Sequence, residues 1–193
     1  MEAIRRRQLI DAAIASIGRY GYGEATVQRI SRAAGVSSGI IHHYFGGKDE
    51  LLEASMRDLL AELRREVAGR LAKATTPRAR LEAIVEGNFA PSQFDPPVVA
   101  AWLAFWSEAR HAPKLARLQR INHRRLLSNL RHAFSAVLAP EAAAQAATGL
   151  AALIDGLWLN AALSGERNID EALAIAQRFL DRELSDGAAM KRQ

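Results

Sequence analysis

Apolar residues return every three or four positions along most of the chain, a spacing that collects them on one face of an α-helix. Leu9, Ala13 and Ile17 show this spacing near the N-terminus. No stretch has the strict alternation of apolar and polar residues that is typical of β-strands. The pattern predicts an all-α protein of about nine helices, which we expect over residues 4–17, 27–34, 38–44, 49–71, 77–89, 95–111, 114–138, 141–163 and 169–184.

The second and third of these helices are short and are joined by a turn that contains glycine, the layout of a helix-turn-helix unit. Thr26 is a good N-cap for the first of the pair, because its hydroxyl can accept a backbone N–H of the first turn. Gly35 can end that helix in the left-handed conformation without a Cβ clash. Ser37 is the N-cap candidate of the next helix. Small helical bundles that bind no nucleic acid also contain such pairs, so the layout alone leaves both alternatives open.

The helix over residues 38–44 begins with small polar residues, which let its backbone approach the floor of a DNA groove closely. Ile41 and Phe45 lie four positions apart and are expected to point into the core. Gly46 and Gly47 then end the helix. A lysine at the start of the following helix is unfavourable for the helix dipole, so Lys48 indicates a ligand-binding role, such as gripping a phosphate.

One set of residues in this unit has a recognisable spacing, namely Gly35-Val36-Ser37, Ile41, His43-Tyr44-Phe45, Lys48 and Leu51-Leu52. The set resembles the DNA-binding domain of the tetracycline-repressor (TetR) family of bacterial regulators, closely over about the first 50 residues and in outline over the whole chain. The resemblance implies a helix-turn-helix DNA-binding domain over residues 1–48 and a ligand-binding and dimerisation domain over residues 49–193. It also implies a homodimer on a pseudo-palindromic double-stranded operator, with the last two helices of each subunit forming a four-helix interface.

By this resemblance and by helix geometry, the candidate DNA-binding residues form two groups. Those expected to face the major groove are Ser37, Ser38, Gly39, Ile40, His42 and His43. Those expected to contact phosphates are Thr26, Tyr44 and Lys48. The isoleucine can touch a thymine methyl group, and the histidines can bond base edges or phosphates. Adjacent histidines point apart on a helix, so we expect no metal site there.

The excess of positive charge lies in the N-terminal part of the chain, as we expect of a part that binds DNA. Residues 1–48 hold seven Lys/Arg against three Asp/Glu, whereas the rest of the chain holds nineteen against eighteen. Arg5, Arg6 and Arg7 crowd the start of the first helix, where they suit either phosphate contacts or a solvated terminus equally well. The arginines of the helix over residues 114–138 are expected to form a solvated or acid-paired face.

The candidate ligand-binding residues are aromatic side chains and one carboxylate, all outside the first 48 residues. They are Phe89, Trp102, Phe105, Trp106, Asp155 and Trp158. Aromatic faces beside a carboxylate can hold a quaternary ammonium ion, whose head donates no hydrogen bond. Aromatic residues at helical spacing are equally typical of an ordinary core, so the spacing alone does not decide between the two.

Three longer stretches, residues 36–57, 100–131 and 150–164, resemble those members of the TetR family that repress glycine-betaine synthesis genes and sense choline. The resemblance implies a repressor that responds to choline, either by releasing DNA or by altered repression. The alternative is a repressor of the same family with another cationic or hydrophobic ligand, controlling an efflux or catabolic operon.

The composition and motifs of the chain exclude several other classes of protein. The 193 residues contain no cysteine, which excludes disulfides, thiol catalysis and thiolate metal sites. No glycine-rich phosphate loop, nucleophile elbow or metal-ligand spacing occurs, so we expect neither an enzyme nor a cofactor. No uninterrupted apolar run approaches the roughly 20 residues that span a bilayer, and the N-terminus lacks a secretory signal. We therefore expect a cytoplasmic protein without a membrane partner.

Overall fold

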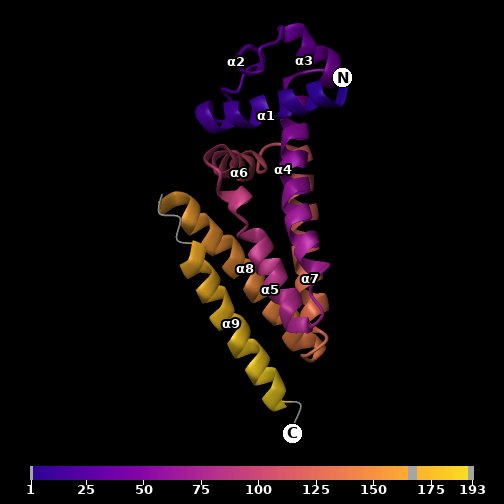
Figure 1. The fold of residues 1–193 in the computed structure, drawn as a ribbon, viewed down its shortest axis with the longest axis vertical. Coiled ribbons are helices and arrows are strands. Elements are labelled where there is room, and N and C mark those ends of the chain that lie inside the picture. The colour runs from indigo at the N-terminus through magenta and orange to yellow at the C-terminus, as the bar shows by residue number, and fades with distance from the viewer. Residues whose placement is uncertain (1, 165–168, 191–193) are drawn as a thin grey trace. The chain divides into compact units, whose positions relative to one another are not determined.

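The computed structural model describes residues 2–164 and 169–190, and across these residues the prediction of an all-α protein is confirmed. They form nine α-helices, one short 3-10 helix and no β-strand. In chain order (Figure 1) the elements are α1 Glu2–Tyr20, α2 Val27–Ala33, α3 Ser38–Phe45, α4 Lys48–Leu71, α5 Pro77–Asn88, η1 Pro91–Phe94, α6 Pro96–Glu108, α7 Pro113–Phe134, α8 Pro140–Ser164 and α9 Ile169–Met190.

Two helices end later in the chain than the sequence pattern predicts, and one short helix was not predicted. Helix α1 continues to Tyr20 and stops at Gly21, whose φ of 80° is left-handed and whose N–H bonds the carbonyl of Ile17. Helix α9 continues to Met190, beyond the expected end at residue 184. The 3-10 helix η1 was not expected from the sequence.

The chain divides into two compact units, each built from two separate segments. The N-terminal unit contains residues 1–62 and 95–121, and the C-terminal unit contains residues 63–94 and 122–193. Helices α4 and α7 each pass from one unit to the other, and α6 belongs with the N-terminal helices. The division into functional domains at residue 48 stays a prediction, since these units describe packing alone.

The N-terminal unit buries the apolar face predicted for its first helix. Leu9, Ile17, Ile30 and Ile41, from three different helices, are almost completely buried. Helix α6 packs against α1, and a Cβ atom added at Gly18 of α1 would lie 3.0 Å from a backbone atom of α6 (Figure 1). The absence of a side chain there permits the close helix crossing.

An ion-pair cluster also joins α4 to the beginning of α7 within the N-terminal unit. Glu53 accepts a hydrogen bond of 2.5 Å from Arg57 and pairs with Lys114 at 3.3 Å. The hydrogen bond from Arg57 lowers the pKa of the Glu53 carboxyl, and Lys114 acts in the same direction.

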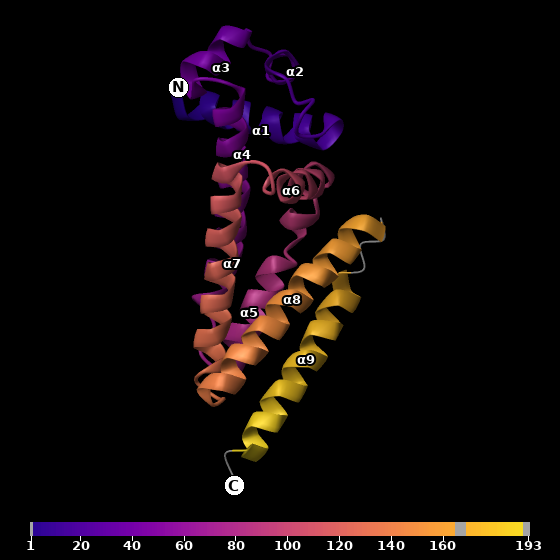
Figure 2. The same cartoon turned by 180° about the vertical axis from the view of Figure 1, so that it is seen from behind.

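The C-terminal unit is assembled around α5, α8 and α9. Thr76 caps α5 by accepting the Ala79 N–H at 3.1 Å, and Pro77 occupies the first helical position. Helices α8 and α9 lie side by side and run in opposite directions, as the two opposed views agree (Figures 1 and 2). Gly87 of α5 lies so near α4 that an added Cβ atom would come within 2.6 Å of Val67.

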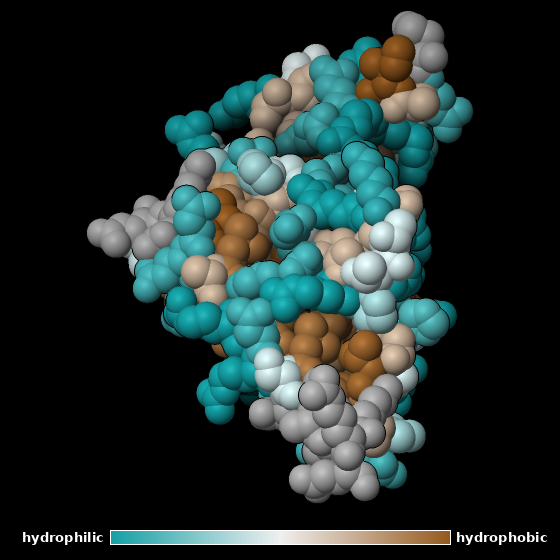
Figure 3. Space-filling view, turned by 60° about the horizontal axis from the view of Figure 1, so that its bottom comes forward, coloured by the Kyte–Doolittle hydropathy of each residue, from teal (hydrophilic) through white to brown (hydrophobic). Residues whose placement is uncertain are grey.

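Helix α8 is, by length and composition, apolar enough to cross a membrane, and a third of its most apolar stretch is buried inside the protein. Its buried residues include Leu150, Ile154 and Trp158, which make it a core helix of its unit. Leu159 and Leu163 of the same helix are 37% and 67% exposed. Hydrophobic side chains also reach the surface in patches on the face drawn in Figure 3.

Candidate nucleic-acid interface and aromatic clusters

The turn between α2 and α3 is closed by hydrogen bonds that only a glycine at position 35 permits without strain. Gly35 has a φ of 64°, and its N–H bonds the carbonyl of Arg32 at 3.2 Å. The N–H of Val36 bonds the carbonyl of Ser31 at 3.0 Å. These two bonds form the Schellman ending of a helix. They confirm the left-handed glycine and fix the direction in which α3 leaves α2.

The start of α3 is small and open, as the sequence indicates. Ser37 stands at the N-cap position with extended backbone, but its hydroxyl makes no capping hydrogen bond. Ser37 and Gly39 are exposed, and a Cβ atom added at Gly39 would meet no atom within 4 Å. The predicted cap is therefore correct in position and wrong in its side-chain bond, which leaves the Ser37 hydroxyl free for an external partner.

The opposite face of α3 holds the helix against α2. Ile41 is completely buried, and the hydroxyls of Ser38 and Ser31 lie 3.2 Å apart. Ser31 also donates to the carbonyl of Gln28, so Ser38 is the donor of the pair. Ser38 thus contributes to helix packing, while the neighbouring Ile40 is half-buried.

The end of α3 carries two exposed histidines. Nδ1 of His42 lies 3.2 Å from the carbonyl oxygen of Gly46, whose φ of 88° ends the helix. A carbonyl only accepts, so Nδ1 carries the proton, and in the neutral ring Nε2 remains an acceptor. The rings of His43 and Tyr44 meet edge to face at 5.1 Å. Within the described residues no cluster of three metal-ligating side chains forms.

The two remaining phosphate-contact candidates are already engaged inside the protein. Thr26 caps α2 as predicted, its hydroxyl oxygen accepting the Arg29 N–H at 3.3 Å. Its own proton stays available to a phosphate oxygen. Lys48 donates to the carbonyl of Gly23 at 2.6 Å, which leaves two of its three N–H groups for other acceptors. This second role of Lys48, as an anchor of the loop before α2, had no signal in the sequence.

The arginines at the start of α1 take internal partners. Arg6 donates to the carbonyl of Tyr44 at 2.5 Å, and its guanidinium lies 4.3 Å from the ring centroid of Phe45. A cation at this end of α3 is favourable for the helix dipole. Arg7 pairs with Asp11 and with Asp58. Arg6 is thus a positioning residue of α3 that sequence reasoning missed.

The aromatic candidates fall into two clusters, one in each unit. In the C-terminal unit the rings of Phe89 and Phe94 stack at 6.1 Å, and Phe94 lies 5.9 Å from Trp158. All three are buried, and Phe94 is a member that sequence reasoning missed. In the N-terminal unit Trp102 lies 5.7 Å from Phe105 and 6.4 Å from Trp106.

Asp155, the carboxylate candidate, lies in the C-terminal unit. Its side chain is exposed, whereas Trp158 on the same helix is buried, so the two do not share one environment. Desolvation by burial raises the pKa of the Asp155 carboxyl, and the nearby His123 side chain opposes that rise.

The chain is similar to known proteins over nearly all its length. Residues 9–62 match the bacterial regulatory proteins of the tetR family, and residues 77–185 match the C-terminal part of BetI-type transcriptional repressors. It is 52% identical over 188 residues to the HTH-type transcriptional regulator BetI 2 of Chromohalobacter salexigens, covering 96% of this chain and 91% of the relative. It is 49% identical over 197 residues to BetI of Cronobacter sakazakii, and the match covers 100% of this chain and 97% of that relative.

Solved structures agree with these relatives in fold. A transcriptional regulator of Pseudomonas aeruginosa PAO1 is 29% identical, with a TM-score of 0.85 over 98% of this chain and 95% of that one. A regulator from Saccharomonospora viridis, crystallised in complex with choline, is 25% identical. Its TM-score is 0.78, over 93% of this chain and 96% of that one.

Proposed function

This chain belongs to the TetR family of bacterial transcriptional regulators and is a BetI-type repressor, and from that premise we propose that it controls choline-to-glycine-betaine genes in response to choline. A repressor of this family is a DNA-binding protein and not an enzyme. The observation that carries the proposal is the identity of about half of all residues to regulators named BetI, over almost the full chain.

The open face of α3 supports the proposed contact with the major groove. Ser37, Gly39, His42 and His43 are exposed there, and nothing adjoins Gly39 that would keep DNA at a distance. The proposed phosphate contacts are Thr26, Tyr44 and Lys48. Thr26 still has its O–H donor, and Lys48 still has two N–H donors, for phosphate oxygens. Ser38 and Ile40 are half-buried, so their proposed share of the contact is smaller.

A homodimer is the proposed DNA-binding form, acting in the cytoplasm on a pseudo-palindromic operator. Two reading helices must lie about 34 Å apart, or a multiple of that distance, to enter successive major grooves. The exposed Leu159 and Leu163 of α8 provide apolar surface that a second subunit can cover. Sedimentation that found only monomer at micromolar concentration would count against this part of the proposal.

Choline recognition rests on the chemistry of a quaternary ammonium ion. The cation is attracted to aromatic faces and makes no hydrogen bond through its head. Phe89 and Trp158 offer such faces in one unit, and Trp102, Phe105 and Trp106 in the other. The choline bound to the regulator of Saccharomonospora viridis supports the same class of effector here.

The test is DNase protection of the DNA upstream of the gene, with and without choline. A protected pseudo-palindrome whose protection changes on adding choline is the expected result. The matched control ligand is 3,3-dimethylbutan-1-ol, which has the shape of choline without its charge and should leave the footprint unchanged. Protection that ignores choline but responds to another cationic or hydrophobic compound would favour the alternative effector. Adjacent genes for choline and betaine-aldehyde dehydrogenases would support the first reading, and a transporter gene the second.

A further inference from the structure

His42, in the last turn of α3, has one of its two ring nitrogens bonded to the backbone of its own helix end. Nδ1 lies 3.2 Å from the carbonyl oxygen of Gly46, and the Gly46 N–H in turn bonds the His42 carbonyl at 2.9 Å. A carbonyl oxygen can only accept, so Nδ1 carries the proton. In the neutral ring Nε2 is then an acceptor with no proton to donate, and the helix presents a single tautomer of His42.

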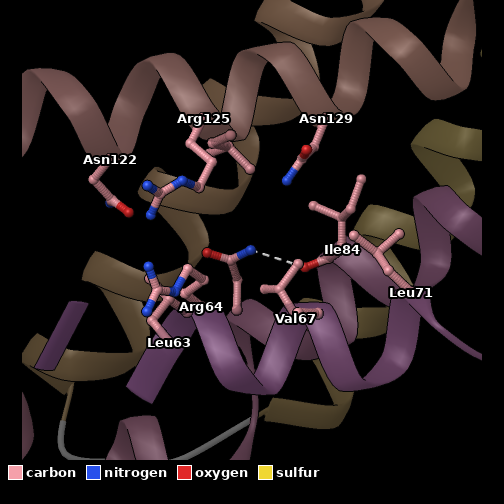
Figure 4. Close-up of a pocket in the computed structure, with 11 residues that line it drawn as sticks. Leu63, Arg64, Val67, Leu71, Ile84, Asn122, Arg125 and Asn129 are labelled. Carbon is pink, nitrogen blue, oxygen red and sulfur yellow. Dashed lines mark hydrogen bonds between the residues drawn. The ribbon is translucent and has the colours of Figure 1, made fainter. Parts of the chain in front are cut away.

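The bond to Gly46 distinguishes His42 from the histidine beside it. A side chain with two polar ends is oriented once one end bonds the backbone, as for Asn88 of α5, whose amide nitrogen donates to the Ile84 carbonyl at 2.8 Å, the dashed line in Figure 4. His43 makes no such bond in the described part of the chain, and its ring only meets Tyr44 edge to face. The tautomer of His43 is therefore not fixed by the protein.

The free nitrogen of His42 is open to an external partner. The side chain of His42 is exposed, and Gly39 lies on the neighbouring turn of the same side of α3. A Cβ atom added at Gly39 would meet no atom within 4 Å. Nothing at Gly39 would therefore keep the edge of a base away from Nε2 of His42.

A hydrogen-bond acceptor in the major groove discriminates between the bases. Adenine and cytosine present an exocyclic amino group there, whereas guanine and thymine present acceptor oxygens in its place. Two acceptors that face each other repel and leave both without a hydrogen bond. The neutral ring of His42 should therefore favour adenine or cytosine over guanine or thymine on the strand that it faces.

We propose that His42 is a specificity-determining residue of the operator contact. Its Nε2 atom accepts a hydrogen bond from the exocyclic amino group of one adenine or cytosine in each half-site, because the bond from Nδ1 to Gly46 fixes the tautomer. The inference rests on the proposed DNA-binding function, and it names the base chemistry that this part of α3 recognises. It does not depend on the choline response.

The test is a set of gel-shift titrations on the protected operator at about pH 8, where an imidazole is neutral. Within one half-site each adenine is replaced in turn by purine, and each cytosine by 2-pyrimidinone, which removes only the amino group. At one position the natural chain should bind about three- to tenfold more weakly, the loss expected for one hydrogen bond. His42→Asn keeps a nitrogen that can bond Gly46 but has no atom in place of Nε2, so at this position it should bind both DNAs equally.

Two further variants control for changes in the reading helix itself. His42→Gln, whose amide oxygen can replace the Nε2 acceptor, should retain the dependence on the amino group. His43→Asn is the matched control, and at this position it should lose as much affinity on removal of the amino group as the natural chain does.

Two results would overturn the role of His42 while leaving the proposed repressor function in place. One is operator binding that no amino-group removal weakens, and the other is an equal loss at every position in the natural chain and in His42→Asn. A chain that protects no DNA would overturn both proposals, so the footprint separates the two failures.

Discussion

The close crossing of α4 and α5 lets us predict how much stability the protein loses when one methyl group is added at Gly87. In Gly87→Ala the new Cβ atom would lie 2.6 Å from a side-chain atom of Val67 and 2.8 Å from its Cα atom. Because backbone cannot move aside as a flexible side chain can, the two helices must separate. Overpacking of this kind costs about 1–3 kcal/mol, and the better helix propensity of alanine returns up to about 1 kcal/mol. We expect a net destabilisation of about 1–2 kcal/mol.

The assay is thermal unfolding followed by circular dichroism at one fixed protein concentration, because subunit association would make the midpoint depend on concentration. For a chain of this size the expected loss lowers the midpoint by about 3–6 °C. Gly69→Ala is the matched control, since its Cβ atom would enter open space and should stabilise α4 by about 0.5–1 kcal/mol. A Gly87→Ala variant as stable as the natural chain would show that α4 and α5 do not cross this closely.

Three further predictions concern the N-terminal unit. Lys48→Ala should weaken DNA binding similarly on all sequences and reduce its salt slope by about one unit, whereas Lys73→Ala, an exposed lysine of the other unit, should leave the slope unchanged. Gly35→Ala should lose about 1 kcal/mol of stability in urea unfolding, because a φ of 64° is unfavourable for alanine. Gly39→Ala, whose Cβ atom would enter open space in α3, should lose no stability but should bind DNA more weakly in gel-shift titrations. Glu53→Gln should cost about 1 kcal/mol or less near pH 7, because the cations that pair with Glu53 are largely exposed. The pKa of Glu53 is lower in the folded protein than in the unfolded chain. The difference in unfolding free energy between Glu53→Gln and the natural chain should therefore be constant above about pH 4.5 and disappear as the pH falls through the folded pKa. Urea unfolding at several pH values measures this difference.

Local backbone chemistry is the part of the fold that could be predicted from the sequence. Thr26 caps its helix as expected, and Gly35 takes the left-handed conformation. Each of these features depends on a few neighbouring residues, so the spacing of residue types is enough to indicate it. Ser37 shows the limit of such reasoning, because its position in the helix is right and its capping bond is not made.

Long-range contacts of the site could not be predicted in the same way. Arg6 bonds a carbonyl 38 residues away, and Lys48 bonds one 25 residues away. Helical spacing places Trp158 on α8 but does not reveal that its ring meets Phe94, which enters through the unexpected η1. The solvated face predicted for the arginines of α7 is confirmed, because all five of them, Arg117, Arg120, Arg124, Arg125 and Arg131, are exposed.

The burial of the cluster formed by Phe89, Phe94 and Trp158 has a consequence for the effector concentration at which this regulator would respond. All three rings are buried, so a cation can reach one of their faces only when the cluster opens. The apparent affinity at this cluster is then reduced in proportion to the fraction of molecules in which the cluster is open. Under the proposed choline response, such a regulator would ignore traces of the osmoprotectant precursor and react only once it has accumulated.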